Sequence, residues 1–111
     1  MRLSLLALLL GGVLLAALGQ ILFKLGATGR SQFVDFVNLP LLGGLLCYAL
    51  GTTLWIVALS KAPLTVVYPF TALTFVVVYA AGVLVFGEPV STRALAGVGL
   101  IIAGLFFVSV P

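Results

Sequence analysis

Four positions one helical turn apart give the N-terminal part of the chain a polar stripe. Gly12, Ala16, Gln20 and Lys24 are spaced four residues apart, so on a helix they share one face. Gln20 brings two hydrogen-bond donors and an acceptor, and Lys24 brings a compact charge suited to a phosphate. The stripe indicates an anion site near the end of this helix. The alternative is structural, with Gln20 bonding a neighbouring helix and Lys24 only reaching toward water.

A second polar group follows from residue 68 onward. Tyr68, Thr71 and Phe75 share one face of a helix, beside Pro69. A proline inside a helix lacks the N–H that would bond the carbonyl one turn earlier, so it kinks or loosens the helix there. The freed carbonyl and these side chains form a candidate binding face. The alternative is local packing, with the threonine hydroxyls bonded to their own backbone.

Residues for acid–base or nucleophilic catalysis are scarce. Histidine is absent, and the only acids are Asp35 and Glu88. A single cysteine, Cys47, cannot form a disulfide within the chain, and no group of metal ligands is apparent. We therefore expect a protein that is not an enzyme and that uses no metal and no cofactor.

Glu88 opens a short motif, Glu88-Pro89-Val90-Ser91, before the last apolar run. Its carboxylate can accept hydrogen bonds from the free N–H groups at the start of that run, where the helix dipole also favours an anion. Alternatively it can pair with Lys24 or Arg30. We expect a structural role for Glu88 and Pro89.

The elements that must position these residues are membrane-spanning helices. The chain of 111 residues is 64% hydrophobic and 6% charged, whereas soluble domains carry about 25% charged residues. A helix needs roughly 20 apolar residues to cross a bilayer. We expect an all-α integral membrane protein with a single domain over residues 1–111. Its four transmembrane helices are expected at about residues 3–23, 39–59, 64–86 and 94–110.

Residues suited to the membrane interfaces flank these runs. Lys24 closes the first run, which favours a retained helix over a cleaved signal peptide. Trp55 lies nearer the end of its run and is expected at an interface. Basic residues are divided almost evenly between the two sides, which leaves the orientation open: Arg2 and Lys61 on one, Lys24, Arg30 and Arg93 on the other. No basic run is present that would favour a nucleic-acid partner.

Small residues recur at intervals that permit close helix contacts. Gly43, Cys47 and Gly51 repeat every four residues in the second run, and Gly99 and Ala103 do so in the last. In lipid, such stripes allow backbones to approach and helices to associate by packing. We expect a homodimer, or a heterodimer with a related four-helix chain, surrounded by membrane lipids.

Short motifs in a fixed order resemble the drug/metabolite transporter superfamily over nearly the whole chain. They are Gly19-Gln20-Ile21-Leu22-Phe23-Lys24, Ala62-Pro63, Val67-Tyr68-Pro69 and Gly87-Glu88-Pro89-Val90-Ser91. The length leaves two groups to compare. One is the small multidrug resistance family. The other contains the flippase subunits for aminoarabinose-phosphoundecaprenol, with their EamA-like relatives.

The small multidrug resistance family fits less well at two positions. Its members carry a mid-membrane glutamate that binds a proton and a cationic drug, where this chain has Ala16. They also carry a tryptophan where this chain has Thr71. Alanine cannot bind a proton or balance a cation, so the resemblance does not extend to proton-coupled export by that route.

The flippase subunits are more similar, and their resemblance implies a cargo and a site. The implied cargo is a polyprenyl-phosphate-linked sugar, or a similar amphipathic anion, in a bacterial inner membrane. We expect substrate binding at Gln20, Lys24, Arg30, Tyr68 and Thr71. Of these, Gln20, Lys24 and Tyr68 match the motifs that carry the resemblance. Lys24 and Arg30 would attract the phosphate, and Gln20 and Tyr68 would bond the headgroup.

The same resemblance assigns conformational or structural roles to Gly19, Pro69, Glu88 and Pro89, with Pro69 as the kink for alternating access. Two other functions stay open at this point. One is export of small molecules or cations, for which Glu88 would be the acid. The other is a non-transporting accessory subunit that stabilises a membrane partner.

Overall fold

The computed structural model describes residues 3–109 of the chain. Arg2, assigned above to one membrane side, and Val110, the expected last residue of the fourth span, lie outside this range. Within it the chain forms only helices and their connections. They are α1 (Leu3–Ala27), the 3₁₀ helix η1 (Phe33–Phe36), α2 (Leu39–Leu59), α3 (Leu64–Val67), α4 (Phe70–Leu84) and α5 (Thr92–Ser109).

These helices make four segments long and apolar enough to cross a membrane, with α3 and α4 together forming the third. This confirms the expected fold class. The first segment runs to Ala27 rather than residue 23, because the helix continues past Lys24. A cationic side chain is favourable in the last turn of a helix, where the dipole is negative, so Lys24 need not end it.

Local hydrogen bonds define the other helix ends. The Asn38 side chain accepts from the Leu41 N–H at 3.0 Å and caps α2, whose Pro40 sits in the first turn. The Ser91 hydroxyl accepts from the Ala94 N–H at 3.1 Å, so α5 starts at Thr92 rather than residue 94. The cap that Glu88 was considered for is therefore provided by Ser91.

The third segment is broken at Pro69 and ends earlier than residue 86. Tyr68 and Pro69 separate α3 from α4, as expected where a proline has no N–H to donate. At the other end the Glu88 N–H donates to the Gly82 carbonyl at 3.1 Å. Gly87 has φ +65°, a conformation that glycine adopts easily, and it turns the chain away from α4.

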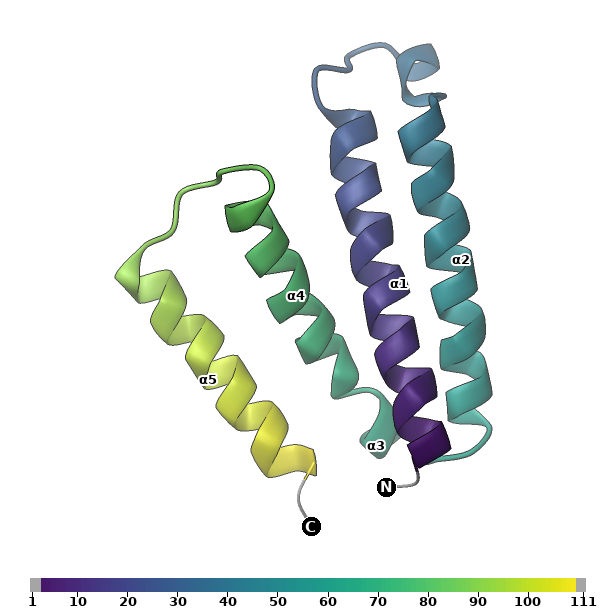
Figure 1. Cartoon of the computed structure of the whole chain (residues 1–111), viewed down its shortest axis with the longest axis vertical. Coiled ribbons are helices and arrows are strands. Elements are labelled where there is room, and N and C mark those ends of the chain that lie inside the picture. Colours follow the sequence, from purple (N-terminus) through teal and green to yellow (C-terminus); the bar gives the residue numbers. More distant parts are fainter. Residues whose placement is uncertain (1–2, 110–111) are drawn as a thin grey trace.

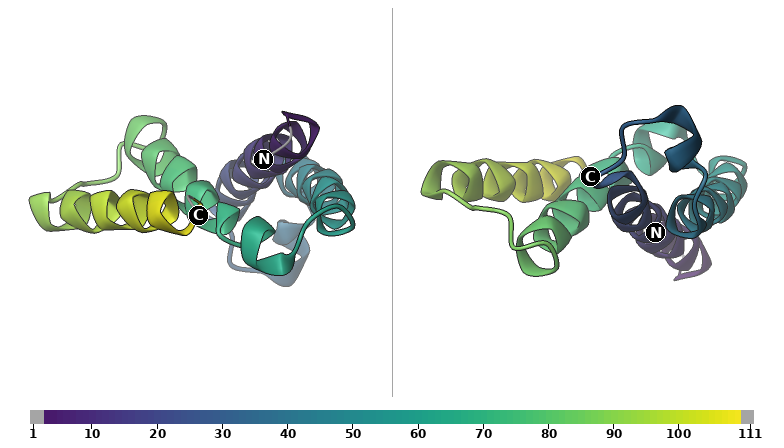
Figure 2. Two further views of the ribbon diagram at one scale, coloured as in Figure 1. Left: turned by 90° about the horizontal axis from the view of Figure 1, so that it is seen from below. Right: turned by 90° about the horizontal axis from the view of Figure 1, so that it is seen from above.

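The helices lie in a flat arrangement of two antiparallel hairpins (Figure 1). The extents are 48 × 36 × 18 Å. One hairpin contains α1 and α2, and the other contains α4 and α5. Helix α4 packs against α1, whereas α5 packs chiefly against α4 and extends away from the first hairpin (Figure 2). The pairing of α1 with α2 is the most extensive in the molecule.

Glycines allow α1 and α2 to approach backbone to backbone. An ideal Cβ at Gly19 would lie 3.0 Å from the Gly44 carbonyl oxygen, and one at Gly51 would lie 3.2 Å from the Gly12 carbonyl oxygen. Side chains larger than hydrogen would push the helices apart. Gly44 and Gly51 of α2 therefore serve a contact within the chain. Gly51 is the one member of the Gly43, Cys47 and Gly51 stripe for which this backbone contact is seen.

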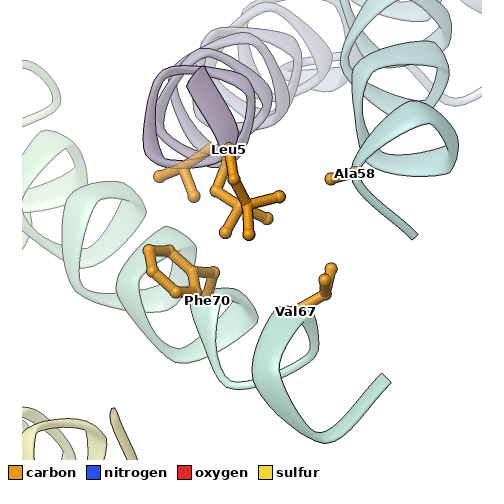
Figure 3. Packing of buried hydrophobic residues seen from close by; sticks show 6 residues of the cluster. Leu5, Ala58, Val67 and Phe70 are labelled. Atoms are coloured by element: carbon orange, nitrogen blue, oxygen red, sulfur yellow. The ribbon is translucent and has the colours of Figure 1, made fainter. Parts of the chain in front are cut away.

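An apolar cluster closes one end of the helix arrangement. Leu5 and Leu9 of α1 meet Ala58 of α2, Val67 of α3 and Phe70 of α4 (Figure 3). Leu9, Ala58 and Val67 have no exposed surface. The break at Pro69 lets α3 turn toward the other helices so that Val67 can reach this cluster. The cluster thus ties the two hairpins together at the end where α2 turns into α3.

Helix α5 contributes no residue to the buried core of the described chain. Its half-buried residues Ala94, Ile101 and Leu105 face α4, while Gly99 and Ala103 lie on the opposite, exposed side. An ideal Cβ at Gly99 would have no atom within 4 Å. One side of α5 is therefore left for lipid or for a partner.

Gly44→Ala should destabilise the protein by about 1–3 kcal/mol, the usual cost of overpacking. The new Cβ would lie 2.9 Å from the Gly19 carbonyl oxygen and 2.7 Å from a Phe23 ring carbon. Thermal unfolding in mild detergent, followed by circular dichroism, measures the change. The control is Gly104→Ala, whose Cβ meets nothing within 4 Å and should not lower the melting temperature. Equal melting temperatures for both variants would contradict the close approach of α1 and α2.

Candidate functional site

A cavity of about 390 Å³ lies between α1, α2 and α4, with Tyr68 of the α3–α4 connection at its wall. We name it the aromatic cavity. None of the described residues that line it is charged, and most carry an aromatic ring, a hydroxyl or no bulky side chain. They are Gly12, Val13, Ala16, Gln20, Tyr48, Gly51, Thr52, Trp55, Tyr68, Thr71 and Thr74. The cavity offers uncharged hydrogen-bonding groups at membrane depth, where polar groups are costly unless they are used.

Three aromatic rings give the aromatic cavity its shape. Trp55 and Tyr68 meet edge to face, with ring centroids 6.5 Å apart and an interplanar angle of 76°. Trp55 also packs against the apolar cluster, and it borders the cavity as well. Tyr48 packs against Phe23, with the two ring centroids 6.1 Å apart. Tyr68 is 61% exposed, so the cavity is open on its side.

Two threonine hydroxyls of the aromatic cavity, those of Thr71 and Thr74, donate to backbone carbonyls of their own helix region. The Thr71 hydroxyl donates to the Tyr68 carbonyl at 2.8 Å, and the Thr74 hydroxyl makes a long 3.5 Å contact to the Phe70 carbonyl. This is the local bonding considered as the alternative for these residues. A hydroxyl whose hydrogen is used still has lone pairs, so it can accept a hydrogen bond from a ligand.

A smaller cavity of about 190 Å³, the lysine cavity, lies between α1 and the end of α4. Lys24 and Gln20 line it from α1, and Glu88 lines it from the connection to α5. Gln20 also lines the aromatic cavity, so the two cavities share one wall residue. One lysine and one glutamate therefore border a space that adjoins an uncharged polar cavity.

The Glu88 carboxylate lies against α4 at Gly82, which has no side chain to block it. An ideal Cβ at Gly82 would lie 2.8 Å from Glu88 Oε1, so the absence of a side chain there leaves room for the carboxylate. Glu88 and Pro89 also border a third cavity of about 220 Å³, beside the stacked rings of Phe75 and Tyr79. The carboxylate thus lies between the α1 side and the outer side of α4.

The structure brings together most of the residues that the sequence singled out. Gln20, Tyr68 and Thr71 line the aromatic cavity, and Lys24 lines the lysine cavity. Arg30 lies in the connection after α1, where its Nε donates to the Gly26 carbonyl at 3.2 Å, and it lines neither cavity. Gly19 lies where the backbones of α1 and α2 approach each other, against Gly44.

Sequence reasoning missed the contribution of α2 to the site. Tyr48, Thr52 and Trp55 line the aromatic cavity, although Trp55 was expected at a membrane interface. Their spacing of four and three residues places them on one helical face, a signal present in the sequence. The same face carries Gly51, so the contact with Gly12 turns it toward α1.

An open, uncharged polar cavity between membrane-spanning helices, beside a single lysine, is the kind of site that defines a membrane transporter. The comparisons with known proteins agree. Residues 1–110 match the model of the EamA-like transporter family. The chain therefore belongs to the EamA-like transporter family.

Three relatives are described as probable subunits of one flippase. A probable 4-amino-4-deoxy-L-arabinose-phosphoundecaprenol flippase subunit ArnE of Pseudomonas syringae pv. syringae is 36% identical over 84% of this chain and 89% of its own. The corresponding ArnF of Erwinia tasmaniensis is 34% identical over 92% and 91%. The ArnF of Shewanella sediminis is 42% identical over 59% of this chain, but this match covers only 46% of that protein. No solved structure matches the chain.

A cysteine in the aromatic cavity should react with a small water-soluble methanethiosulfonate, because thiolates form where water enters. With Cys47→Ser as background, Thr52→Cys places a thiol in the cavity, and Phe106→Cys places one on the exposed surface of α5. We expect rapid labelling at position 52 and slow labelling at position 106, measured by mass spectrometry of the reconstituted protein. Equal rates would mean that acyl chains, not water, fill the cavity.

Proposed function

We propose that this protein is a flippase subunit that moves a polyprenyl-phosphate-linked sugar across the bacterial inner membrane. The observation that carries the proposal is the lysine cavity joined through Gln20 to the aromatic cavity. A sugar phosphate has the same two parts, a charged group and a neighbouring set of hydroxyls. The names of the relatives, which describe flippase subunits for such a lipid, support the same function.

The phosphate binds at Lys24 in this proposal, and the sugar enters the aromatic cavity. Lys24 is a point charge on a flexible stem, which suits a phosphate approaching from several directions. Gln20 lies one turn, about 6 Å, before Lys24 along α1 and can bond the sugar or the bridging oxygen. Glu88 balances the charge of Lys24 until the phosphate arrives. Arg30, whose Nε is held at the end of α1, attracts the phosphate from outside the cavities.

The open sides of the cavities suit an amphipathic cargo. Gln20, Tyr68 and Thr71 are exposed at the edge of the aromatic cavity, so a headgroup can enter while its polyprenyl tail stays among the lipids. The apolar cluster closes the arrangement at the end near Val67. Access from the other side requires this cluster to part, and the break at Pro69 is the point where α3 can move relative to α4.

The working unit is a dimer in this proposal, either of two copies or with a related four-helix chain. A single chain surrounds the cavities on only part of their circumference, since its helices lie in a flat layer. The exposed side of α5, with Gly99 and Ala103 four residues apart, is the surface for the partner. The relatives named ArnE and ArnF are described as subunits, which fits a pair of related chains.

Lys24→Ala should weaken binding of undecaprenyl phosphate roughly tenfold or more. Hydrogen bonds to charged groups contribute about 1.5–3 kcal/mol, and 1.4 kcal/mol is tenfold in affinity. Native mass spectrometry of protein released from mild detergent measures the bound lipid. Lys61→Ala, in the turn after α2 and outside both cavities, is the matched control and should bind as the wild type does. An unchanged affinity in Lys24→Ala would remove Lys24 from the site.

Gly99→Leu should abolish the homodimer while each chain still folds, as judged by an unchanged helical circular dichroism spectrum. The position is open in the monomer, so a large side chain is accommodated there but holds the partner helix away. Oligomeric mass in nanodiscs provides the measurement, and Ala49→Leu on the exposed side of α2 is the control. A dimer that persists in Gly99→Leu would place the interface elsewhere. A monomeric wild type would exclude the homodimer and leave the pairing with a related chain.

A further inference from the structure

We propose that the cavity of about 220 Å³ on the outer side of α4 is a second binding site, which takes the ammonium headgroup of a lipid of the surrounding bilayer. We name it the outer cavity. It is lined by Phe75, Val78, Tyr79, Val83, Glu88 and Pro89. It shares no described lining residue with the aromatic cavity, and it shares Val78 and Glu88 with the lysine cavity. The inference goes beyond the proposed function, because a bilayer lipid can bind here whether or not the protein moves a cargo.

The charge of the outer cavity favours a cation. Glu88 is exposed, and it is the one charged residue among the described residues that line the cavity. The Tyr79 hydroxyl is the one side-chain donor among them, and Pro89 has no N–H to offer. The carboxylate, in contrast, accepts several hydrogen bonds. A primary ammonium, which carries a positive charge and three N–H donors, matches this wall.

The aromatic rings of the outer cavity favour the same ligand. Phe75 and Tyr79 are stacked, with ring centroids 6.2 Å apart and an interplanar angle of 25°. The faces of such rings attract ammonium groups, and the attraction increases when water is excluded. A carboxylate beside aromatic rings therefore offers an ammonium an ion pair and a cation–π contact together. An anionic headgroup would be repelled by both.

The place of the outer cavity along α4 fits a lipid. Helix α4 ends at Leu84, and the connection folds back so that the Glu88 carboxylate lies beside Gly82, in the last turn. The carboxylate therefore lies near the membrane surface, where lipid headgroups are found. Phe75, about 10 Å further from this end of the helix, is 50% exposed and offers a surface for an acyl chain. Arg93, exposed in the first turn of α5, is available for the lipid phosphate.

The outer cavity shares its carboxylate with Lys24. Both Lys24 and Glu88 line the lysine cavity, so the lysine and a lipid ammonium compete for one negative charge. Removing Lys24 should therefore strengthen binding of the lipid, while it removes the charge proposed to hold the cargo phosphate. The two sites predict opposite effects of a single substitution.

The test compares phosphatidylethanolamine with phosphatidylglycerol of identical acyl chains. The protein is reconstituted in nanodiscs with equal amounts of both, and native mass spectrometry identifies the lipid that the chain retains longest as collision energy rises. We expect the wild type to retain phosphatidylethanolamine roughly tenfold more often, a value within the range of cation–π contacts. The net charge of +3 would by itself favour the anionic lipid, so this preference reports a specific site.

Glu88→Gln and Tyr79→Leu should each lose most of this preference. The hydrogen bond from the Glu88 N–H to the Gly82 carbonyl is made by the backbone, so Glu88→Gln keeps the connection in place. Lys24→Ala should increase the preference severalfold, because it removes the competing cation. Asp35→Asn changes the other acid of the chain, which lines none of the three cavities, and this matched control should bind as the wild type does.

Equal retention of the two lipids by the wild type would overturn the inference, as would a preference that survives in both Glu88→Gln and Tyr79→Leu. A preference lowered by Lys24→Ala would overturn the competition for Glu88. A dimer that is lost in Tyr79→Leu, without any lipid preference in the wild type, would place a second copy of the chain on the outer cavity instead. Binding of undecaprenyl phosphate, measured separately, tests the proposed function.

Discussion

The contact between the backbones of α1 and α2 is the constraint on which the rest of this structure depends. In a bilayer, moving an apolar side chain from lipid to a helix contact gains little free energy, because both surroundings are apolar. Helices therefore associate through close packing. Two glycine pairs provide that packing: Gly12 with Gly51, and Gly19 with Gly44. The contact fixes the rotation of both helices about their axes. That rotation directs Gln20 of α1 and the Tyr48, Thr52 and Trp55 face of α2 into one shared space.

The architecture could be predicted from the sequence, because few kinds of fold can span a membrane. A long run without charge must be a helix in the bilayer, since every backbone polar group needs a partner there. The boundaries were less accessible, because they depend on individual hydrogen bonds such as the Ser91 cap and the Glu88 N–H to Gly82. The break at Pro69 followed from the chemistry of proline, but the place of Val67 in the apolar cluster did not.

The site was accessible only in part, for a physical reason. Gln20 and Lys24 stand out because polar side chains in an apolar helix are rare and their spacing is regular. Tyr48 and Trp55 do not stand out in this way, because aromatic residues are common at membrane interfaces. Whether such a ring faces lipid or a cavity depends on the neighbouring helix. Arg30 is the opposite case. It stands out in the sequence as a basic residue near a proposed anion site, but its side chain bonds the end of its own helix.

The apolar cluster near Pro69 has a consequence for the cell's energy supply. Any protein that lets a polar group cross a membrane risks opening a path for protons or ions at the same time. Leu9, Ala58 and Val67 are fully buried at the end of the helix arrangement, and Phe70 covers them. A hydrocarbon constriction of this kind does not hold a continuous chain of water. Under the proposed function, the same residues that join the two hairpins also oppose the passage of water and ions between them while the protein is idle.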